Sequence, residues 1–373
     1  MDGAVVFSLR ERRLRFFAKR TKNPLRAAEK YAMIKENGMP QGGKRLHMKI
    51  GTIGTGNIVT WVMTEAVRTA GVTYEAIYSR GEATGRALAE RFGVSKVYTK
   101  LEDMLADPAV DWVYVASPNS LHYAQTKAAL ESGKHVICEK PFTPTRAQAE
   151  ELAALAERKG LFLLEGITTL FQPHFARIRE NLSKIGPVRQ VSCTFCQYSS
   201  KFDALMAGQT PNVFNPAFAG GALMDINLYN LYFVYGLFGM PETLHYYPRR
   251  HANGVDLGGV AVLEYPGFVC ECTGAKDCKG ENGAHIIGEK GFIRVENPVS
   301  MCTRVTVVTD EGEQVFDEQQ GETAWYWEMQ GIAGLVAADD RADCRRRMEK
   351  TIQMMELLER ARQDAGIVFP GID

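Results

Sequence analysis

Three residues of this 373-residue chain have the clearest capacity for chemistry: a lysine, an aspartate and a tyrosine. Lys140 follows a buried apolar stretch and directly precedes Pro141, which restrains its backbone at a strand end. An ammonium group there can donate a hydrogen bond to a substrate hydroxyl and stabilise the alkoxide that develops as hydride leaves the same carbon. Asp225 and Tyr229 are four residues apart in a helical stretch, so both side chains should emerge on one face.

A glycine turn gives a second chemical signal, for a nucleotide. Residues 48–53 read as a short buried strand, and Gly54-Thr-Gly56 leads from it into a helix. Gly54 permits the tight turn, and Gly56 lets the backbone approach a pyrophosphate that rests on the helix N-terminus. Val59 stands where Gly or Ala is usual, so the helix should pack slightly further from the strand. Directly after a strand and at the head of a β/α repeat, this motif predicts a dinucleotide site.

The residues at the end of the second strand indicate which dinucleotide binds. An NAD-selective site places Asp or Glu there to accept a hydrogen bond from the ribose 2′-hydroxyl. This strand ends in Tyr78-Ser79-Arg80, and Glu75 lies too early to reach the ribose. A hydroxyl and a guanidinium suit a 2′-phosphate, so NADP(H) is favoured and NAD(H) stays possible. The alternative is that Arg80 is an ordinary exposed residue at a helix start.

The elements that must position these residues change in character along the chain. Up to about residue 168, strands alternate with helices of 10–15 residues, which predicts an α/β fold with a doubly wound parallel sheet. Ligands on such sheets bind at the carboxyl ends of the strands. From about residue 169, several strands separated by turns predict an α+β unit with a large, mostly antiparallel open sheet and helices on one face. The loop over residues 201–218 should overhang the site.

Four motifs in this order resemble the Gfo/Idh/MocA oxidoreductases, a family that includes glucose–fructose oxidoreductase, inositol dehydrogenase and dihydrodiol dehydrogenase. The motifs are Gly54-x-Gly56-Asn57-Ile58, Ser117-Pro118-Asn119-Ser120-Leu121-His122, Glu139-Lys140-Pro141 and Gly220-Gly-Ala-Leu-Met-Asp225-Ile-Asn-Leu-Tyr229. The resemblance covers essentially residues 48–373. The resemblance implies an NAD(P)-binding Rossmann domain (48–168) and a substrate-binding and oligomerisation domain (169–373), after a basic leader (1–47) that it does not cover.

The resemblance also implies roles for single residues. Lys140 stabilises the reacting oxygen, Tyr229 exchanges the substrate proton, and Asp225 binds substrate hydroxyls or orients the base. A nearby Lys140 should lower the pKa of the Tyr229 phenol towards neutrality. The expected cofactor-binding residues are Gly54, Gly56, Asn57, Ile58, Ser79, Arg80, Ser117, Pro118, Asn119, His122, Glu139 and Lys140.

Several features depart from the family pattern or leave an alternative open. Tyr232 and other aromatic residues lie beside Tyr229, which could therefore be a core aromatic instead of an acid–base group. Asn227 replaces a glycine that is usual between the aspartate and the base. Thr168 and Leu170 stand where many relatives carry Trp and Arg, so a less cationic pocket is expected.

These observations predict an NAD(P)-dependent oxidoreductase that transfers hydride between nicotinamide and a hydroxyl-bearing carbon of a sugar, polyol or diol-like substrate. One alternative is a glycoside hydrolase that uses NAD for transient oxidation. Another is a cofactor-binding regulator with a degenerate site, against which the intact Lys140, Asp225 and Tyr229 argue.

A homodimer or homotetramer is expected, because exposed sheet faces seldom stay bare.

Composition restricts the partners, the compartment and the metal content that the protein is expected to have. Lys+Arg and Asp+Glu both number 44, so the net charge predicts no nucleic-acid partner. No stretch has the uninterrupted apolar length of a membrane span, and eight cysteines in so long a chain suit a reducing cytoplasm. Cys193-Thr-Phe-Cys196 has a metal-binding spacing but lies in a predicted strand, where residues three apart face opposite sides, so no metal is predicted.

The leader is strongly basic, with 12 Lys and Arg against 4 Asp and Glu in residues 1–47. Residues 9–20 could form a basic amphipathic helix that contacts a membrane or nucleic acid. The favoured interpretation is different. Gly42-Gly43-Lys44 can be encoded by a purine run of the kind that recruits bacterial ribosomes, shortly before Met48. Met48 is therefore the predicted natural start.

Overall fold

A computed structural model of the chain describes residues 47–317, 319 and 321–373. The predicted leader, residues 1–47, lies outside the described residues apart from His47, and the prediction of a start at Met48 stays a prediction. The first described strand begins at Met48. No helix in the described part of the chain has both the length and the hydrophobicity of a membrane span.

The first sheet has six parallel strands in the order β3-β2-β1-β4-β5-β6, which confirms the predicted doubly wound arrangement. The strands are β1 (Met48–Ile53), β2 (Val72–Tyr78), β3 (Lys96–Tyr98), β4 (Trp112–Val115), β5 (His135–Glu139) and β6 (Leu163–Gly166). The sequence pattern does not reveal β3 or the helix α5 (Leu101–Ala106) after it, because such short elements carry too little periodicity.

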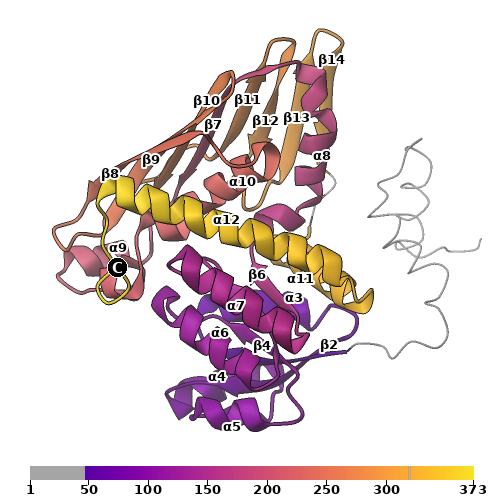
Figure 1. Ribbon diagram of the computed structural model, residues 1–373, viewed down its shortest axis with the longest axis vertical. Coiled ribbons are helices and arrows are strands. Elements are labelled where there is room, and N and C mark those ends of the chain that lie inside the picture. The colour runs from indigo at the N-terminus through magenta and orange to yellow at the C-terminus, as the bar shows by residue number, and fades with distance from the viewer. Residues whose placement is uncertain (1–46, 318, 320) are drawn as a thin grey trace, which may run out of the picture. The chain divides into compact units, whose positions relative to one another are not determined.

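Two hydrophobic clusters cover the two faces of this sheet. On one face pack α6 (His122–Glu131) and α7 (Arg146–Lys159). On the other face pack α3 (Asn57–Ala66), α4 (Glu82–Phe92) and α11 (Ala324–Ala337). Because α11 comes from the far end of the chain, the C-terminal region covers part of the N-terminal sheet (Figure 1).

The second sheet has eight strands in the order β14-β13-β12-β11-β7-β10-β9-β8. β7 and β10 pair in parallel and the other neighbours are antiparallel, so the predicted mostly antiparallel sheet is confirmed. The strands are β7 (Val188–Cys196), β8 (Thr243–Arg250), β9 (Asp256–Tyr265), β10 (Phe268–Ala275), β11 (Gly283–Gly288), β12 (Gly291–Glu296), β13 (Arg304–Thr309) and β14 (Gly312–Phe316).

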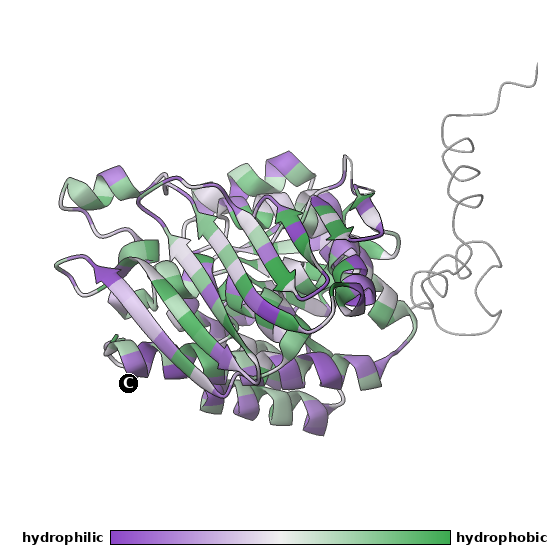
Figure 2. Cartoon of the chain, turned by 90° about the horizontal axis from the view of Figure 1, so that it is seen from above, coloured by the Kyte–Doolittle hydropathy of each residue, from purple (hydrophilic) through white to green (hydrophobic). Residues whose placement is uncertain are grey.

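Helices cover one face of the second sheet. α8 (Pro173–Asn181), α10 (Leu228–Phe238) and α12 (Arg341–Ala365) pack there (Figure 1). Along β10 the buried Cys270 and Cys272 alternate with the exposed Val269 and Glu271, which point away from the helices. Figure 2 shows hydrophobic and hydrophilic residues mixed along the strands of this sheet.

The last two helices tie the halves of the described chain together. α12 packs against α7 and β6 of the first half and against β8 of the second, while α11 lies on α3. The side chains of Trp61 on α3 and Trp325 on α11 stack with their ring centroids 5.0 Å apart. The boundary expected at residue 168 stays a prediction, but α12 packs against strands of both sheets.

Candidate active site

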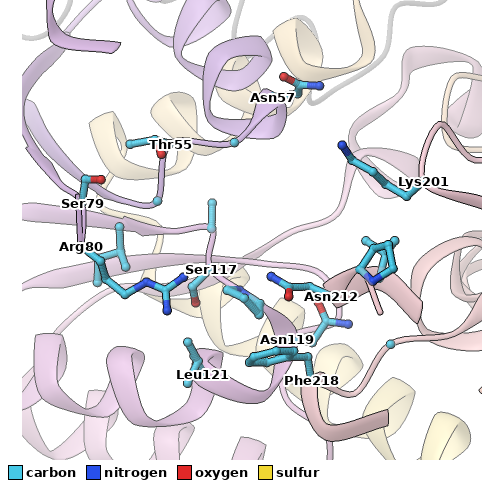
Figure 3. A pocket seen from close by; sticks show the side chains of 18 of the residues that line it. Thr55, Asn57, Ser79, Arg80, Ser117, Asn119, Leu121, Lys201, Asn212 and Phe218 are labelled. Carbon is cyan, nitrogen blue, oxygen red and sulfur yellow. The ribbon is translucent and has the colours of Figure 1, made fainter. Parts of the chain in front are cut away.

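A cavity of about 970 Å³ opens at the carboxyl ends of β1, β2 and β4, where ligands bind on parallel sheets. Its wall includes the glycine turn, the end of β2, the loop after β4, and residues of the 201–220 region (Figure 3). The predicted cofactor residues that line it are Gly54, Gly56, Asn57, Ser79, Arg80, Ser117, Pro118 and Asn119. Ile58, His122, Glu139 and Lys140 do not line it.

The two glycines of the turn have different reasons for being glycine. Gly54 has φ of +115°, and a Cβ on it would lie 2.5 Å from the carbonyl oxygen of Ala116. Gly56 precedes α3 with an ordinary φ of −73°, and a Cβ there would meet nothing within 4 Å. Gly54 is therefore needed by the fold of the turn itself, whereas Gly56 faces the open cavity.

The N-terminus of α3 is left open towards a ligand. The helix starts at Asn57 without a side-chain cap and has no acidic residue in its first turn. Its first N–H groups and its dipole therefore favour an anion.

Ser79 and Arg80 differ in how far they can reach a ligand. The buried Ser79 hydroxyl donates to the carbonyl of Gly81 at 2.8 Å and lies 2.8 Å from the Thr84 hydroxyl. Arg80 is exposed, and no hydrogen bond or ion pair joins it to another residue that the structure describes. Its guanidinium points into the cavity (Figure 3). Local bonds thus occupy Ser79, while the charge of Arg80 is open to a ligand.

The loop after β4 connects the cavity to neighbouring segments. The Asn119 amide Nδ2 donates to the backbone carbonyl of Ala219 at 2.8 Å. His122 is buried beneath the loop, with Nδ1 2.9 Å from the Pro141 carbonyl and Nε2 2.9 Å from the Ser117 carbonyl. Burial lowers the pKa of His122. This histidine shapes the loops and does not face the cavity.

The predicted overhanging loop forms the opposite wall. Lys201, Asn212 and Phe218 line the cavity from this side, and Lys201 lies across from the glycine turn (Figure 3). The short helix α9 (Phe202–Met206) follows Lys201 and was not apparent from the sequence pattern.

Lys140 and Asp225 meet although 85 residues separate them in the chain. Lys140 directly follows β5, and its peptide bond to Pro141 is cis. Its Nζ donates to Asp225 Oδ1 at 2.8 Å and to the Asp225 backbone carbonyl at 2.9 Å. Burial opposes the charge on Lys140, but Asp225, Tyr229 and Glu139 outweigh it and raise the lysine pKa. For Asp225, burial is outweighed by two lysines, which lower its pKa.

Tyr229 lies beside the same lysine. The Lys140 Nζ is 4.9 Å from the centroid of the Tyr229 ring, which is cation–π distance. The expectation that Lys140 brings the phenol pKa towards neutrality is wrong for this structure. Burial raises the pKa of Tyr229, the nearby acidic side chains add to that, and the lowering by Lys140 does not compensate.

The backbone at Asp225 is not the regular α-helix expected. Residues Leu223–Asn227 form a π-helical turn that continues into α10, an irregularity that is frequent at functional sites. Asn227 docks this turn on β10, because its Nδ2 donates to the Cys272 carbonyl at 2.9 Å. A Cβ on Gly274 would lie 2.5 Å from the Cβ of Asn227, so the close approach requires glycine there.

Lys276 is a site residue that the sequence analysis missed. It follows β10, is almost completely buried, and its Nζ donates to Asp225 Oδ2. The available signal was a lysine directly after the small residues Gly274 and Ala275 at a strand end. Nothing local distinguishes it from a surface lysine, because its partner is 51 residues away.

Three buried carboxyl groups, those of Glu139, Glu165 and Glu328, lie close enough to interact electrostatically. Glu139 accepts hydrogen bonds from the Tyr114 hydroxyl and from the Lys140 backbone N–H, the latter at 3.2 Å. Glu165 accepts from the hydroxyls of Tyr232 and Thr351. Glu328 of α11 is fully buried, and neither carboxyl oxygen has a partner among the residues that the structure describes. Burial raises the pKa of all three.

Two sequence predictions concern residues that do not line the cavity. Thr168 is buried, and its hydroxyl donates to the Ser300 carbonyl at 3.0 Å. Leu170 belongs to the short 3₁₀ helix Thr168–Phe171 and packs against the hydrophobic core.

The described residues hold no group of three or more His, Cys, Asp or Glu arranged to bind a metal.

Comparison with known protein families gives two adjacent matches. Residues 48–167 match a family described as oxidoreductase family, NAD-binding Rossmann fold, and residues 175–294 match the GFO/IDH/MocA C-terminal domain. The chain is 31% identical over 324 residues to scyllo-inositol 2-dehydrogenase (NADP(+)) of Bacillus subtilis, covering 87% of this chain and 98% of that protein. It is 31% identical over 306 residues to D-xylose 1-dehydrogenase (NADP(+)) of Hypocrea jecorina, covering 74% and 78% of the two chains.

Solved structures share the fold at lower identity. A levoglucosan dehydrogenase in complex with NADH and levoglucosan superposes with a TM-score of 0.74 at 18% identity, covering 86% of this chain and 97% of the other. A 3-ketoreductase from Actinomadura kijaniata in complex with NADP and TDP-benzene also gives 0.74, at 24% identity and with 85% and 98% coverage. These likenesses concern the arrangement of both sheets.

Proposed function

The chain belongs to the Gfo/Idh/MocA oxidoreductase family, and on that premise we propose that it is an NADP(H)-preferring oxidoreductase for a sugar, polyol or diol-like substrate. NAD(H) is the secondary cofactor of the proposal. Relatives named as NADP(+)-dependent dehydrogenases of an inositol and of xylose support both the cofactor and the substrate class.

The cavity fits a dinucleotide. Gly56 leaves space beside the uncapped N-terminus of α3, where a pyrophosphate would accept hydrogen bonds from backbone N–H groups. Arg80 would pair with the 2′-phosphate, because its guanidinium points into the cavity and has no partner in the described structure. When bound, the nicotinamide accepts or supplies the hydride.

Lys140 is proposed to bind the reacting oxygen of the substrate. Two of the three ammonium donors of Lys140 already contact Asp225, and the third can donate to a hydroxyl or carbonyl oxygen. The same charge stabilises the alkoxide that develops while hydride moves. Asp225 lines the cavity and would accept a hydrogen bond from a substrate hydroxyl.

Tyr229 is proposed to exchange the proton. In the reducing direction its phenol donates a proton to the alkoxide oxygen, and in the oxidising direction its phenolate accepts the proton from the substrate hydroxyl. Because burial raises its pKa, the phenol form prevails in the absence of ligands, which suits the reducing direction.

The observation that carries this proposal is the convergence of Lys140, Asp225 and Tyr229 beside a cavity built on the glycine turn. The test follows NADPH fluorescence for binding and NADPH absorbance for turnover with inositols, pentoses, diols and their ketones. Lys140→Met should lower kcat by about 10²–10³-fold while NADPH binding persists. Lys100→Met, an exposed lysine, is the matched control. Wild-type protein that neither binds NADPH nor turns over any of these compounds would refute the proposal.

We further propose a homodimer or homotetramer that forms through the uncovered face of the second sheet. Val269 and Tyr247 on this face are 47% and 64% exposed, although both are large apolar side chains. A cytoplasmic location is also proposed, supported by the eight cysteines, which all are free thiols in the described structure.

A further inference from the structure

We propose that Lys276 is a positioning residue of the active site, which holds the Asp225 carboxylate and thereby leaves Lys140 available to the substrate oxygen. This inference rests on the proposed oxidoreductase function and deepens it.

The Asp225 carboxylate is divided between two ammonium groups. Oδ1 accepts from Lys140 at 2.8 Å, and Oδ2 accepts from Lys276. The Asp225 side chain is 31% exposed and lines the cavity, whereas that of Lys276 is 3% exposed and does not. Because its side chain is 3% exposed, against 12% for that of Lys140, Lys276 acts on a bound substrate through Asp225 and not by direct contact.

The fold fixes Lys276 in place from several sides. Its backbone N–H donates to the Leu257 carbonyl and its own carbonyl accepts from the Ser199 N–H, both at 2.8 Å. Its ammonium lies 5.0 Å from the centroid of the Phe214 ring. Among the described residues, Asp225 is the carboxylate within ion-pair distance of it. A buried ammonium is tolerated only with such a partner, so the pair is a coupled unit.

The turn that carries Asp225 is docked on the same strand. Asn227 and Asn230 donate to the carbonyls of Cys272 and Thr273 on β10, at 2.9 and 3.0 Å. The close approach is possible because Gly274 has no side chain. β10 therefore positions both the backbone of Asp225 and the ammonium that orients its carboxylate.

This arrangement changes what Lys140 can do. With one carboxylate facing two ammonium groups, the three side chains carry a net charge of one positive unit. Lys140 then retains positive charge for the alkoxide oxygen. Without Lys276, the whole Asp225 carboxylate charge would pair with Lys140 and weaken its stabilisation of the alkoxide. This weakening is large in a buried site, because charges interact strongly there. The Asp225 side chain would also be free to rotate away from the cavity.

The test is a double-mutant cycle in the full-length protein, with kcat and cofactor affinity measured separately. Lys276→Met should lower kcat by about tenfold or more and leave NADPH affinity within about twofold, because Lys276 does not line the cofactor cavity. In an Asp225→Asn background the same change should lower kcat by less than about twofold. The carboxylate charge that Lys276 balances is already absent from that variant. Lys279→Met, an exposed lysine three residues away, is the matched control and should behave like the wild type.

The outcomes separate the possible failures. Lys276→Met activity equal to that of Lys279→Met, or fully additive losses in the double variant, would overturn the inference and leave the oxidoreductase proposal intact. A lack of NADPH-dependent turnover in the wild type would overturn the proposed function, and this inference with it. If Lys276→Met fails to fold, Lys276→Gln provides the same cycle, and Lys276→Arg should recover part of the activity because it keeps the charge.

Discussion

At the scale of single residues, burial of Tyr229 sets how its proton transfer depends on pH. The raised phenol pKa means that the phenolate is the minor form at neutral pH, with Lys140 lowering the pKa and Glu139, Asp225 and Glu328 raising it. The kcat for alcohol oxidation should therefore increase with pH, by about tenfold per unit where the phenol predominates. Carbonyl reduction should stay nearly flat over the same range.

Tyr229→Phe should lower kcat by about 10²–10⁴-fold and remove the pH dependence of oxidation. Tyr247→Phe, an exposed tyrosine on β8, serves as the control for loss of a phenol hydroxyl. Steady-state rates between pH 6 and 9 decide the point. If the Phe variant kept the wild-type profile, another group would have to carry the proton.

Arg80 should decide the preference between the two dinucleotides. One charge-assisted contact with the 2′-phosphate contributes about 1.5–3 kcal/mol, so Arg80→Ala should weaken NADPH binding by roughly 10–100-fold. NADH affinity should change little, because its 2′-hydroxyl carries no charge. Arg86→Ala, an exposed arginine of α4 paired with Glu82, is the control. Equal losses for both dinucleotides would argue against this role.

At the scale of elements, the turn between β1 and α3 separates folding from binding. Gly54→Ala places a Cβ against the Ala116 carbonyl and imposes φ of +115° on an L-residue, so the unliganded protein should lose about 1–3 kcal/mol of unfolding free energy. Gly56→Ala meets no atom within 4 Å, so it should leave that free energy within about 0.5 kcal/mol of wild type.

NADPH binding should show that Gly56 is needed for the cofactor and not for the fold. The methyl group of Gly56→Ala would occupy the space proposed for the pyrophosphate, so NADPH affinity should fall by about tenfold or more. Thermal melts without cofactor and fluorescence titrations with NADPH measure the two effects. Unchanged affinity in Gly56→Ala would show that the dinucleotide lies elsewhere.

At the scale of the whole molecule, the buried carboxyl group of Glu165 links stability to pH. Burial raises its pKa from 4.5 to about 7. A folded-state pKa above the unfolded value means that this contribution is complete below about pH 4.5 and is lost as pH rises to about 7. The free energy of unfolding should therefore fall by up to about 3 kcal/mol over that interval.

Glu165→Gln should remove this part of the pH dependence, because the amide resembles the protonated acid at every pH. Urea unfolding at pH 5, 6, 7 and 8 gives the difference between variant and wild type. The exposed Glu90→Gln should retain the wild-type pH dependence. A variant as pH-dependent as the wild type would assign the effect to other groups.

The proposed subunit contact also belongs to this scale. Val269→Asp would bury an unpaired charge in an interface on the open sheet face and should shift the protein to monomers. Val368→Asp changes a valine that is 63% exposed outside the sheet and should keep the oligomer. Light scattering after size-exclusion chromatography measures both. A wild-type protein that is monomeric at micromolar concentration would refute the proposal.

Features of this protein that depend on local pattern could be predicted from the order of its residues. The glycine turn after the first strand and the loop over residues 201–218 were both expected from local composition, and both line the cavity. The order of strands and helices was enough for a doubly wound parallel sheet followed by a mostly antiparallel one. The motif residues Lys140, Asp225 and Tyr229 could be singled out because strand-end and helical spacing are local properties.

The surroundings of those three residues depend on long-range packing and could not be predicted in this way. Lys276 joins Asp225 across 51 residues, and the buried Glu328 of α11 comes close enough to Glu139 to interact with it electrostatically. The pKa of Tyr229 rises instead of falling, because the burial of its phenol outweighs one neighbouring charge. Desolvation and ion pairing depend on every chain segment that packs around a group, and the spacing of residues along a sequence does not contain that information.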